Sequence, residues 1–240
     1  MSQRPSTVNC SISTCGCSGG GATASGPFKV QWQGAQKNVL SGDIDGHVDL
    51  KQLAELDSLY GLGPLEKVTG EVTILDSKPF VARVQEDGTL SVENSFDNRA
   101  CFLVYSQVER WQRVSLPEDI IDEKTLEHEL PELVAQYGID PEVPFPFLLK
   151  GLPDRVVFHV LNKTDNETHS PDLHEKAKIK YTIEDTGIEV IGFHSTSHRG
   201  IFTPGHSSIH IHLKSEDGTL SGHVDALTFP QGLDLYLPVV

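Results

Sequence analysis

The sequence predicts an α+β fold that is rich in β-strands and built from two sheet-based lobes with a few helices. Three observations support this prediction. Short segments that alternate between apolar and polar residues recur along the chain, turn-forming Gly, Pro and Asp residues separate them, and only two segments have helical periodicity. The 240 residues, 38% of them hydrophobic, are enough for one large core or two small ones. No apolar run approaches the roughly 18 residues of a membrane-spanning helix.

Residues 1–27 are a leader rich in Ser, Gly and Cys, which is expected to be disordered because it has too few apolar residues to pack. Its cysteines match no zinc-binding spacing and are interpreted as reduced thiols. The leader lacks the basic and apolar regions of a secretory signal, which predicts a cytoplasmic location. We expect residues 28–150 to form an N-terminal sheet lobe with the helices, and residues 151–240 to form a C-terminal sheet lobe.

The elements follow in order along the chain. Segment 28–32 alternates like a strand, and residues 48–63 have apolar residues at helical spacing before a glycine, which predicts a helix with a glycine C-cap. The acidic segment 117–139 predicts the other helix, with an apolar face made of Leu126, Leu130, Leu133 and Val134. Further strands are predicted at 68–75, 79–84, 89–94, 101–108, 155–161, 178–183, 188–193, 208–213, 220–229 and 233–238.

The formal net charge of −15 at pH 7 limits the partners of this chain. Nucleic acids and anionic membranes are not expected as partners, because both need a basic surface. An anionic substrate can bind only where a local cation or a metal ion outweighs the negative electrostatic field of the whole protein.

The pentapeptide EDGTL occurs twice, at 86–90 and at 216–220. Asp-Gly between alternating segments predicts a two-residue type I′ hairpin loop. In the second copy this loop places His212 opposite His223, and His210 opposite Asp225. In the first copy the same rule predicts the pairs Arg83–Val92 and Val81–Asn94, which are ordinary sheet residues.

The second hairpin therefore carries three imidazoles on one face, with apolar residues on the other. Three neutral imidazoles suit Zn²⁺ or another borderline divalent metal and leave positions open for water or substrate. A single strand histidine is usually structural, but six of the 11 histidines lie between 194 and 223. Asp225 is a candidate for orienting His210, with a plain surface aspartate as the alternative. His194, His198 and His206 precede the hairpin in a loop and are candidates for the pocket entrance.

The motif formed by His210, His212 and, ten residues later, His223 resembles the metal-binding signature of the α-acetolactate decarboxylase family. Residues 42–84 are similar to the N-terminal region of that family, in which a helix precedes Gly-Leu-Gly and then Gly-Glu. The resemblance implies a two-lobed fold, a homodimer, Zn²⁺ bound by the three histidines, and Glu71 beside the metal. It also implies conversion of a small anionic hydroxy-keto acid, 2-acetolactate, to acetoin and CO₂ through a metal-bound enediolate, with Glu71 as the candidate for proton transfer.

Three positions depart from the pattern of this family. Where the family has an arginine suited to the substrate carboxylate, this chain offers Lys150, with Arg155 five residues later. Pro64 replaces a pocket threonine, and the sequence stops before the tail glutamate of the family. The metal half of the site is thus retained while the substrate half is altered, so His194 or His198 are candidates for the missing roles. Alternatives are another metal-dependent lyase or isomerase on this scaffold, and a non-catalytic metal-binding protein.

Overall fold

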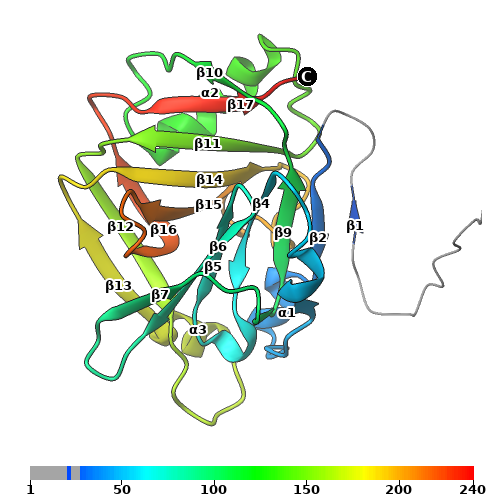
Figure 1. Cartoon of the computed structure of the whole chain (residues 1–240), viewed down its shortest axis with the longest axis vertical. Coiled ribbons are helices and arrows are strands. Elements are labelled where there is room, and N and C mark those ends of the chain that lie inside the picture. The colour runs from blue at the N-terminus through cyan, green and yellow to red at the C-terminus, as the bar shows by residue number, and fades with distance from the viewer. Residues whose placement is uncertain (1–20, 23–27) are drawn as a thin grey trace, which may run out of the picture.

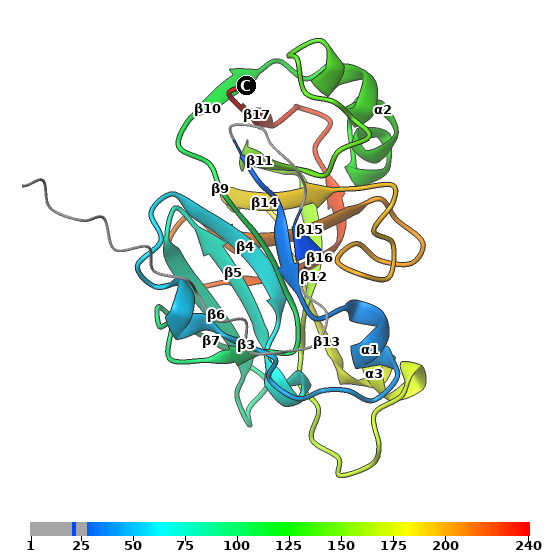
Figure 2. The ribbon, with the colours of Figure 1, turned by 90° about the vertical axis from the view of Figure 1, so that its right-hand side faces the viewer.

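The computed structural model describes residues 21–22 and 28–240, so the predicted leader lies outside the described residues apart from the short strand β1 (Gly21–Ala22). The described residues form two large antiparallel sheets and a two-stranded one. Figure 1 shows strands β11, β14 and β15 of one large sheet running across strands β4 and β9 of the other. The two sheets lie side by side as layers in Figure 2, with α1 and α3 at one end and α2 at the other. The prediction of a β-rich α+β fold with few helices is confirmed.

The first large sheet has the strand order β1-β2-β9-β4-β5-β6-β7. Its further strands are β2 (Gln31–Gln33), β4 (Leu59–Pro64), β5 (Glu71–Leu75), β6 (Lys78–Val84), β7 (Leu90–Glu93) and β9 (Leu103–Gln107). The small sheet pairs β3 (Val48–Asp49) with β8 (Arg99–Ala100). The helices are α1 (Gln36–Leu40), α2 (Glu123–Ala135) and α3 (Pro171–Ala177), with 3₁₀ turns at Leu50–Leu53 and Glu66–Val68.

The second large sheet has the order β10-β17-β11-β14-β15-β16-β12-β13. It is made of β10 (Trp111–Val114), β11 (Phe145–Gly151), β12 (Arg155–Leu161), β13 (Lys178–Ile183), β14 (Ile188–His194), β15 (Ile209–Ser215), β16 (Ser221–Thr228) and β17 (Asp234–Pro238). This sheet begins at residue 111, whereas the sequence placed the second lobe after residue 150. The sequence did not predict β11, because Pro146 cannot donate a ladder hydrogen bond and argues against a strand. The structure tolerates this proline where β11 is paired with β14 alone.

The helix predicted over 48–63 is wrong. Asp49 caps a single 3₁₀ turn, Ser58 has a left-handed φ of 53°, and the chain then enters the buried strand β4. The glycine at position 63 is needed for close packing and not for a helix end. A Cβ atom there would lie 2.2 Å from the Phe102 carbonyl oxygen on the adjacent chain segment.

The helix predicted over 117–139 is confirmed as α2. The side chain of Asp122 accepts a hydrogen bond from the Thr125 backbone N–H, and the Thr125 hydroxyl reaches back in a capping box. The four apolar residues assigned to its face are all buried. One consequence is that α2 packs against β16, the strand that carries His223.

The two EDGTL hairpins have different registers. In the second copy Ser215 bonds to Leu220 across a four-residue loop, and His212 pairs with His223 as predicted. Only Gly218 of this loop has a positive φ, so the loop is not of type I′. In the first copy Gln85 bonds to Thr89 across three residues, which shifts the register by one. Val92 therefore pairs with Ala82, and the predicted pairs of the first copy are wrong.

The two large sheets pack face to face where β5 and β6 contact β12 and β16. Most of the core between and behind them is aliphatic and aromatic, and many of its residues are fully buried. Burial of such side chains contributes about 1.5–3 kcal/mol each, which is the main source of stability for this fold. The histidines of β15 and β16 face the first sheet within this interface, so the packing of the two sheets shapes the site.

Candidate metal centre

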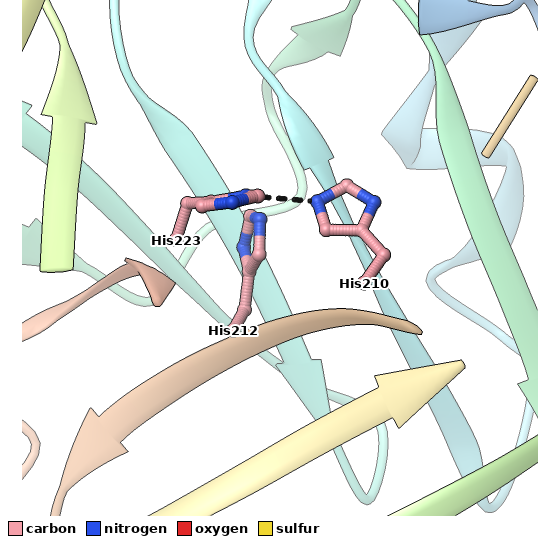
Figure 3. A group of neighbouring side chains, drawn as sticks. All are labelled: His210, His212 and His223. Carbon is pink, nitrogen blue, oxygen red and sulfur yellow. Dashed lines mark hydrogen bonds between the residues drawn. The ribbon is translucent and has the colours of Figure 1, made fainter. Parts of the chain in front are cut away.

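The structure brings His210, His212 and His223 together on adjacent strands (Figure 3). One nitrogen from each ring lies within 4.8 Å of the other two, which is a spacing that one metal ion can bridge. Nε2 of His210 is 3.0 Å from Nδ1 of His223, as the dashed line in Figure 3 shows. Three imidazoles converge because His210 and His212 are two residues apart on β15, while His223 lies directly opposite His212.

Hydrogen bonds on the outer nitrogens fix how two of these rings are oriented. Nδ1 of His210 donates to the Phe202 carbonyl oxygen at 2.7 Å, and Nδ1 of His212 donates to the Val72 carbonyl oxygen at 3.1 Å. Each Nε2 is then left with a lone pair, as a metal ligand requires. Nε2 of His212 is buried and, among the described residues, has no hydrogen-bond partner. A metal ion would satisfy this atom, so the cluster fits a divalent metal.

Burial holds all three imidazoles in the neutral form. It lowers the pKa of His210 to about 4 and the pKa of His212 and His223 well below the ordinary value. Neutral imidazole is the form that binds metal, so at neutral pH no proton has to be displaced from these rings.

Glu71 lies at the start of β5, on the first sheet, and its carboxyl group reaches the cluster. Its Oε2 is 3.8 Å from Nε2 of His212, and the residue is 2% exposed. Burial raises the pKa of Glu71 well above the ordinary value, and the nearby charge of Lys178 opposes that rise. The residue paired with Glu71 on β4 is Pro64, which lines the same cavity.

Asp225 orients a different histidine from the one that the sequence indicated. A bulge in β16 leaves Asp225 as an extra residue opposite β12, and its Oδ1 accepts a 2.9 Å hydrogen bond from Nδ1 of His159. The pairing of Asp225 with His210 does not form, because the β15–β16 ladder ends at the pair His212–His223. His159 pairs with His223 across β12 and β16, and their ring centroids are 4.6 Å apart.

Sequence reasoning missed His159 because one histidine in an apolar strand has no spacing partner. The signal lies in the sheet order, which places β12 beside β16. The structure also groups His159, His223 and Asp225 within ligand distance of one another.

A cavity of about 350 Å³ opens onto the cluster. Glu71, His210 and His223 line it, as do His159, Asp225 and Pro64. His206, Lys178, Lys124, Phe102 and His174 are also in its wall. The volume suits a small organic molecule.

The other residues singled out in the sequence lie away from this cavity. His194 is buried against the ring of Phe145, and His198 bonds to the Ser195 hydroxyl and stacks on Phe202. Lys150 lies two strands from β15, where its ammonium is 3.6 Å from Glu189, and Arg155 is 3.8 Å from Glu184. None of the four lines the cavity, so the structure does not place them against the metal cluster.

Comparison with solved structures shows the same fold in three bacterial proteins. A protein from Staphylococcus aureus described as similar to alpha-acetolactate decarboxylase has a TM-score of 0.68 and 13% identity, over 86% of this chain and 83% of that one. The alpha-acetolactate decarboxylase of Bacillus subtilis strain 168 has a TM-score of 0.68 and 16% identity, over 86% and 82%. The enzyme of Bacillus subtilis subspecies spizizenii has a TM-score of 0.66 and 16% identity, over 86% and 83%.

A search among curated proteins found no match to this sequence. The family model for alpha-acetolactate decarboxylase, in contrast, matches residues 33–237. That range contains every strand from β4 to β16, all three clustered histidines and Glu71. A match over this length, on a fold shared with solved decarboxylases, settles the family. The chain belongs to the alpha-acetolactate decarboxylase family.

Proposed function

We propose that this protein is a zinc-dependent decarboxylase of acetolactate or a closely related 2-hydroxy-3-oxo acid, releasing CO₂ and forming acetoin. Family membership supports an acetolactate decarboxylase-like function and a small-molecule substrate. The observation that carries the proposal is the placement of Glu71 beside three converging imidazoles at the wall of one cavity. Imidazole ligands favour Zn²⁺, and Mn²⁺, Fe²⁺ and Ni²⁺ are the competing ions.

His210, His212 and His223 would hold the metal. When bound, a divalent ion would supply Lewis-acid stabilisation of the negative charge that develops on the ketone oxygen as CO₂ leaves. The hydrogen bonds that His210 and His212 donate to the carbonyl oxygens of Phe202 and Val72 keep these two rings aimed at the same point. Such pre-orientation lowers the cost of assembling the site.

Glu71 would deliver the proton that the reaction needs. Loss of CO₂ leaves an electron pair on carbon, and acetoin forms when that carbon is protonated. The carboxyl group of Glu71 lies 3.8 Å from Nε2 of His212 and lines the cavity, so Oε2 can carry this proton to a substrate bound there. Phe102 in the cavity wall adds apolar surface beside the reacting groups.

The test is CO₂ release and acetoin formation from racemic acetolactate. The zinc-loaded protein is compared with its His212→Ala and Glu71→Gln variants, and with His128→Ala, whose side chain is 86% exposed on α2, as a matched control outside the cavity. We expect full turnover in the wild type and the control, none in His212→Ala, and strongly reduced turnover in Glu71→Gln. Glu71→Gln is expected to keep its zinc while losing at least about 100-fold in kcat, the usual contribution of a positioned acid.

Stoichiometric zinc without turnover would refute the decarboxylase proposal. A panel of hydroxyketones would then test the alternative of a lyase or isomerase on this scaffold. We also propose a homodimer in the cytoplasm, which sedimentation velocity and cell fractionation would test. None of the helices in the described part of the chain is long and apolar enough to cross a membrane.

A further inference from the structure

Lys178 lies on the same face of the second sheet as the histidine cluster. His223, His159 and Lys180 form one row across β16, β12 and β13. Directly paired residues share a face, and so do residues two apart on a strand. Lys178, the first residue of β13, is two residues from Lys180 and therefore lies on the same face of the sheet as the histidines. Its side chain is only 18% exposed and lines the cavity.

Among the described residues two lysines line the cavity, and Lys178 is the one on the sheet face that carries the histidines. Lys124 is the other lysine in the cavity wall, but it is exposed and lies in the first turn of α2. Lys178 is therefore the cation that an anion beside the histidines would meet.

Lys178 makes an ion pair with Glu175 that a substrate carboxylate would readily replace. Its Nζ donates to Oε1 of Glu175 at 2.5 Å, and the Glu175 side chain is 66% exposed. An ion pair with an exposed carboxylate contributes little, about 0–1 kcal/mol. A substrate carboxylate inside the cavity would compete with Glu175 from a less hydrated position, where the same contact is stronger.

We propose that Lys178 binds the carboxylate of the substrate and makes the cavity selective for substrates that carry a carboxylate over neutral hydroxyketones. The inference rests on the proposed function, and it assigns the cation role to a lysine on β13 in place of Lys150 or Arg155. It also explains how a chain with a net charge of −15 admits an anion. Lys178 is a substrate-binding residue in this proposal, and it is not a metal ligand.

The test measures binding to the zinc-loaded chain by titration calorimetry. One probe is 2,3-dihydroxy-2-methylbutanoate, the reduced and anionic analogue of acetolactate, and the other is acetoin, which lacks the carboxylate. For Lys178→Met we expect about ten- to hundredfold weaker binding of the anion, the range for a hydrogen bond to a charged group. Acetoin affinity and zinc content should not change. Lys178→Arg should keep most of the anion affinity.

Three further variants sharpen the test. Glu175→Gln removes the competing carboxylate and should tighten anion binding. Lys176→Met makes the same charge change at an exposed residue near the end of α3, and Lys124→Met makes it elsewhere in the cavity wall. Neither should change the anion affinity by more than about twofold, as for a solvated charge.

Two results would overturn the proposal: wild-type anion affinity in Lys178→Met, and a zinc-loaded wild type that binds no anionic analogue. Failure of the proposed function has a different signature. In that case the dihydroxy acid binds in a Lys178-dependent way, yet acetolactate releases no CO₂.

Discussion

Replacing His194 by leucine should make this protein more stable. His194 is 0% exposed, and within the described part of the chain neither ring nitrogen has a hydrogen-bond partner. A buried polar group without a partner costs about 1–3 kcal/mol, and the imidazole has two such atoms. Leucine has similar volume but loses the ring contact with Phe145, where the centroids are 4.8 Å apart, worth about 0.5–1.5 kcal/mol. The expected net gain at pH 7 is at least about 0.5 kcal/mol.

The gain should grow in acid. Burial lowers the pKa of His194 from 6.5 to about 4. Below pH 6.5 the unfolded chain binds a proton at this residue that the folded chain refuses, so the free energy of unfolding of the wild type falls as pH falls towards 4. At pH 5 the loss from this residue is about 2 kcal/mol, and the leucine variant does not suffer it. The difference in unfolding free energy between the two proteins should therefore be about 2 kcal/mol larger at pH 5 than at pH 7.

The assay is urea unfolding of both proteins at pH 7 and pH 5, with thermal melts alongside. For a chain of this size each 1 kcal/mol shifts Tm by about 2–4 °C. His128→Leu is the control, since its side chain is 86% exposed on α2 and such a change is expected to stay within about 0.5 kcal/mol. A destabilised His194→Leu protein, or an unchanged difference between the two pH values, would refute the reasoning and indicate a buried water on the ring.

Three further predictions concern the site and its support. His212→Ala should lower zinc affinity by more than about 100-fold, since outer partners of zinc ligands alone contribute about 10–100-fold; metal analysis after dialysis checks this. Gly222→Ala should weaken zinc binding and stability together, because its Cβ would lie 2.6 Å from the His159 carbonyl oxygen. Glu127→Gln should cost about 1–3 kcal/mol at pH 7, because its carboxylate accepts three hydrogen bonds, two of them from Ser208. Burial alone would raise the pKa of Glu127, but the hydrogen bonds from Ser208 and Ser207 outweigh it, so the pKa is lowered overall. The stabilisation is therefore present above about pH 4.5 and is lost progressively as pH falls below that value. Acid titration followed by circular dichroism checks this.

The sequence could predict what depends on neighbours along the chain. Alternation predicted strands such as β12 and β13, and periodicity predicted the buried face of α2. Local turn chemistry predicted the pairing of His212 with His223. These properties are local because the repeat of apolar residues and the turn residues lie in one short segment.

Even local turn chemistry had a limit. The two EDGTL copies are identical in sequence, yet their loops differ by one residue, and in the second copy the Ser215 hydroxyl accepts a hydrogen bond from the Leu220 backbone N–H. A shift of one residue moves every side chain to the opposite face of a strand. The histidine face exists because the second copy has the longer loop.

The sequence by itself determined a β-rich chain with a three-histidine hairpin, a buried helical face and a family. Only the tertiary structure decided which residues surround that hairpin. Sheet order placed His159 beside His223, a bulge turned Asp225 towards His159, and β13 brought in Lys178, while Lys150 fell two strands away. The physical reason is that non-local strand pairing sets these distances, and no spacing along the chain encodes the order of strands in a sheet.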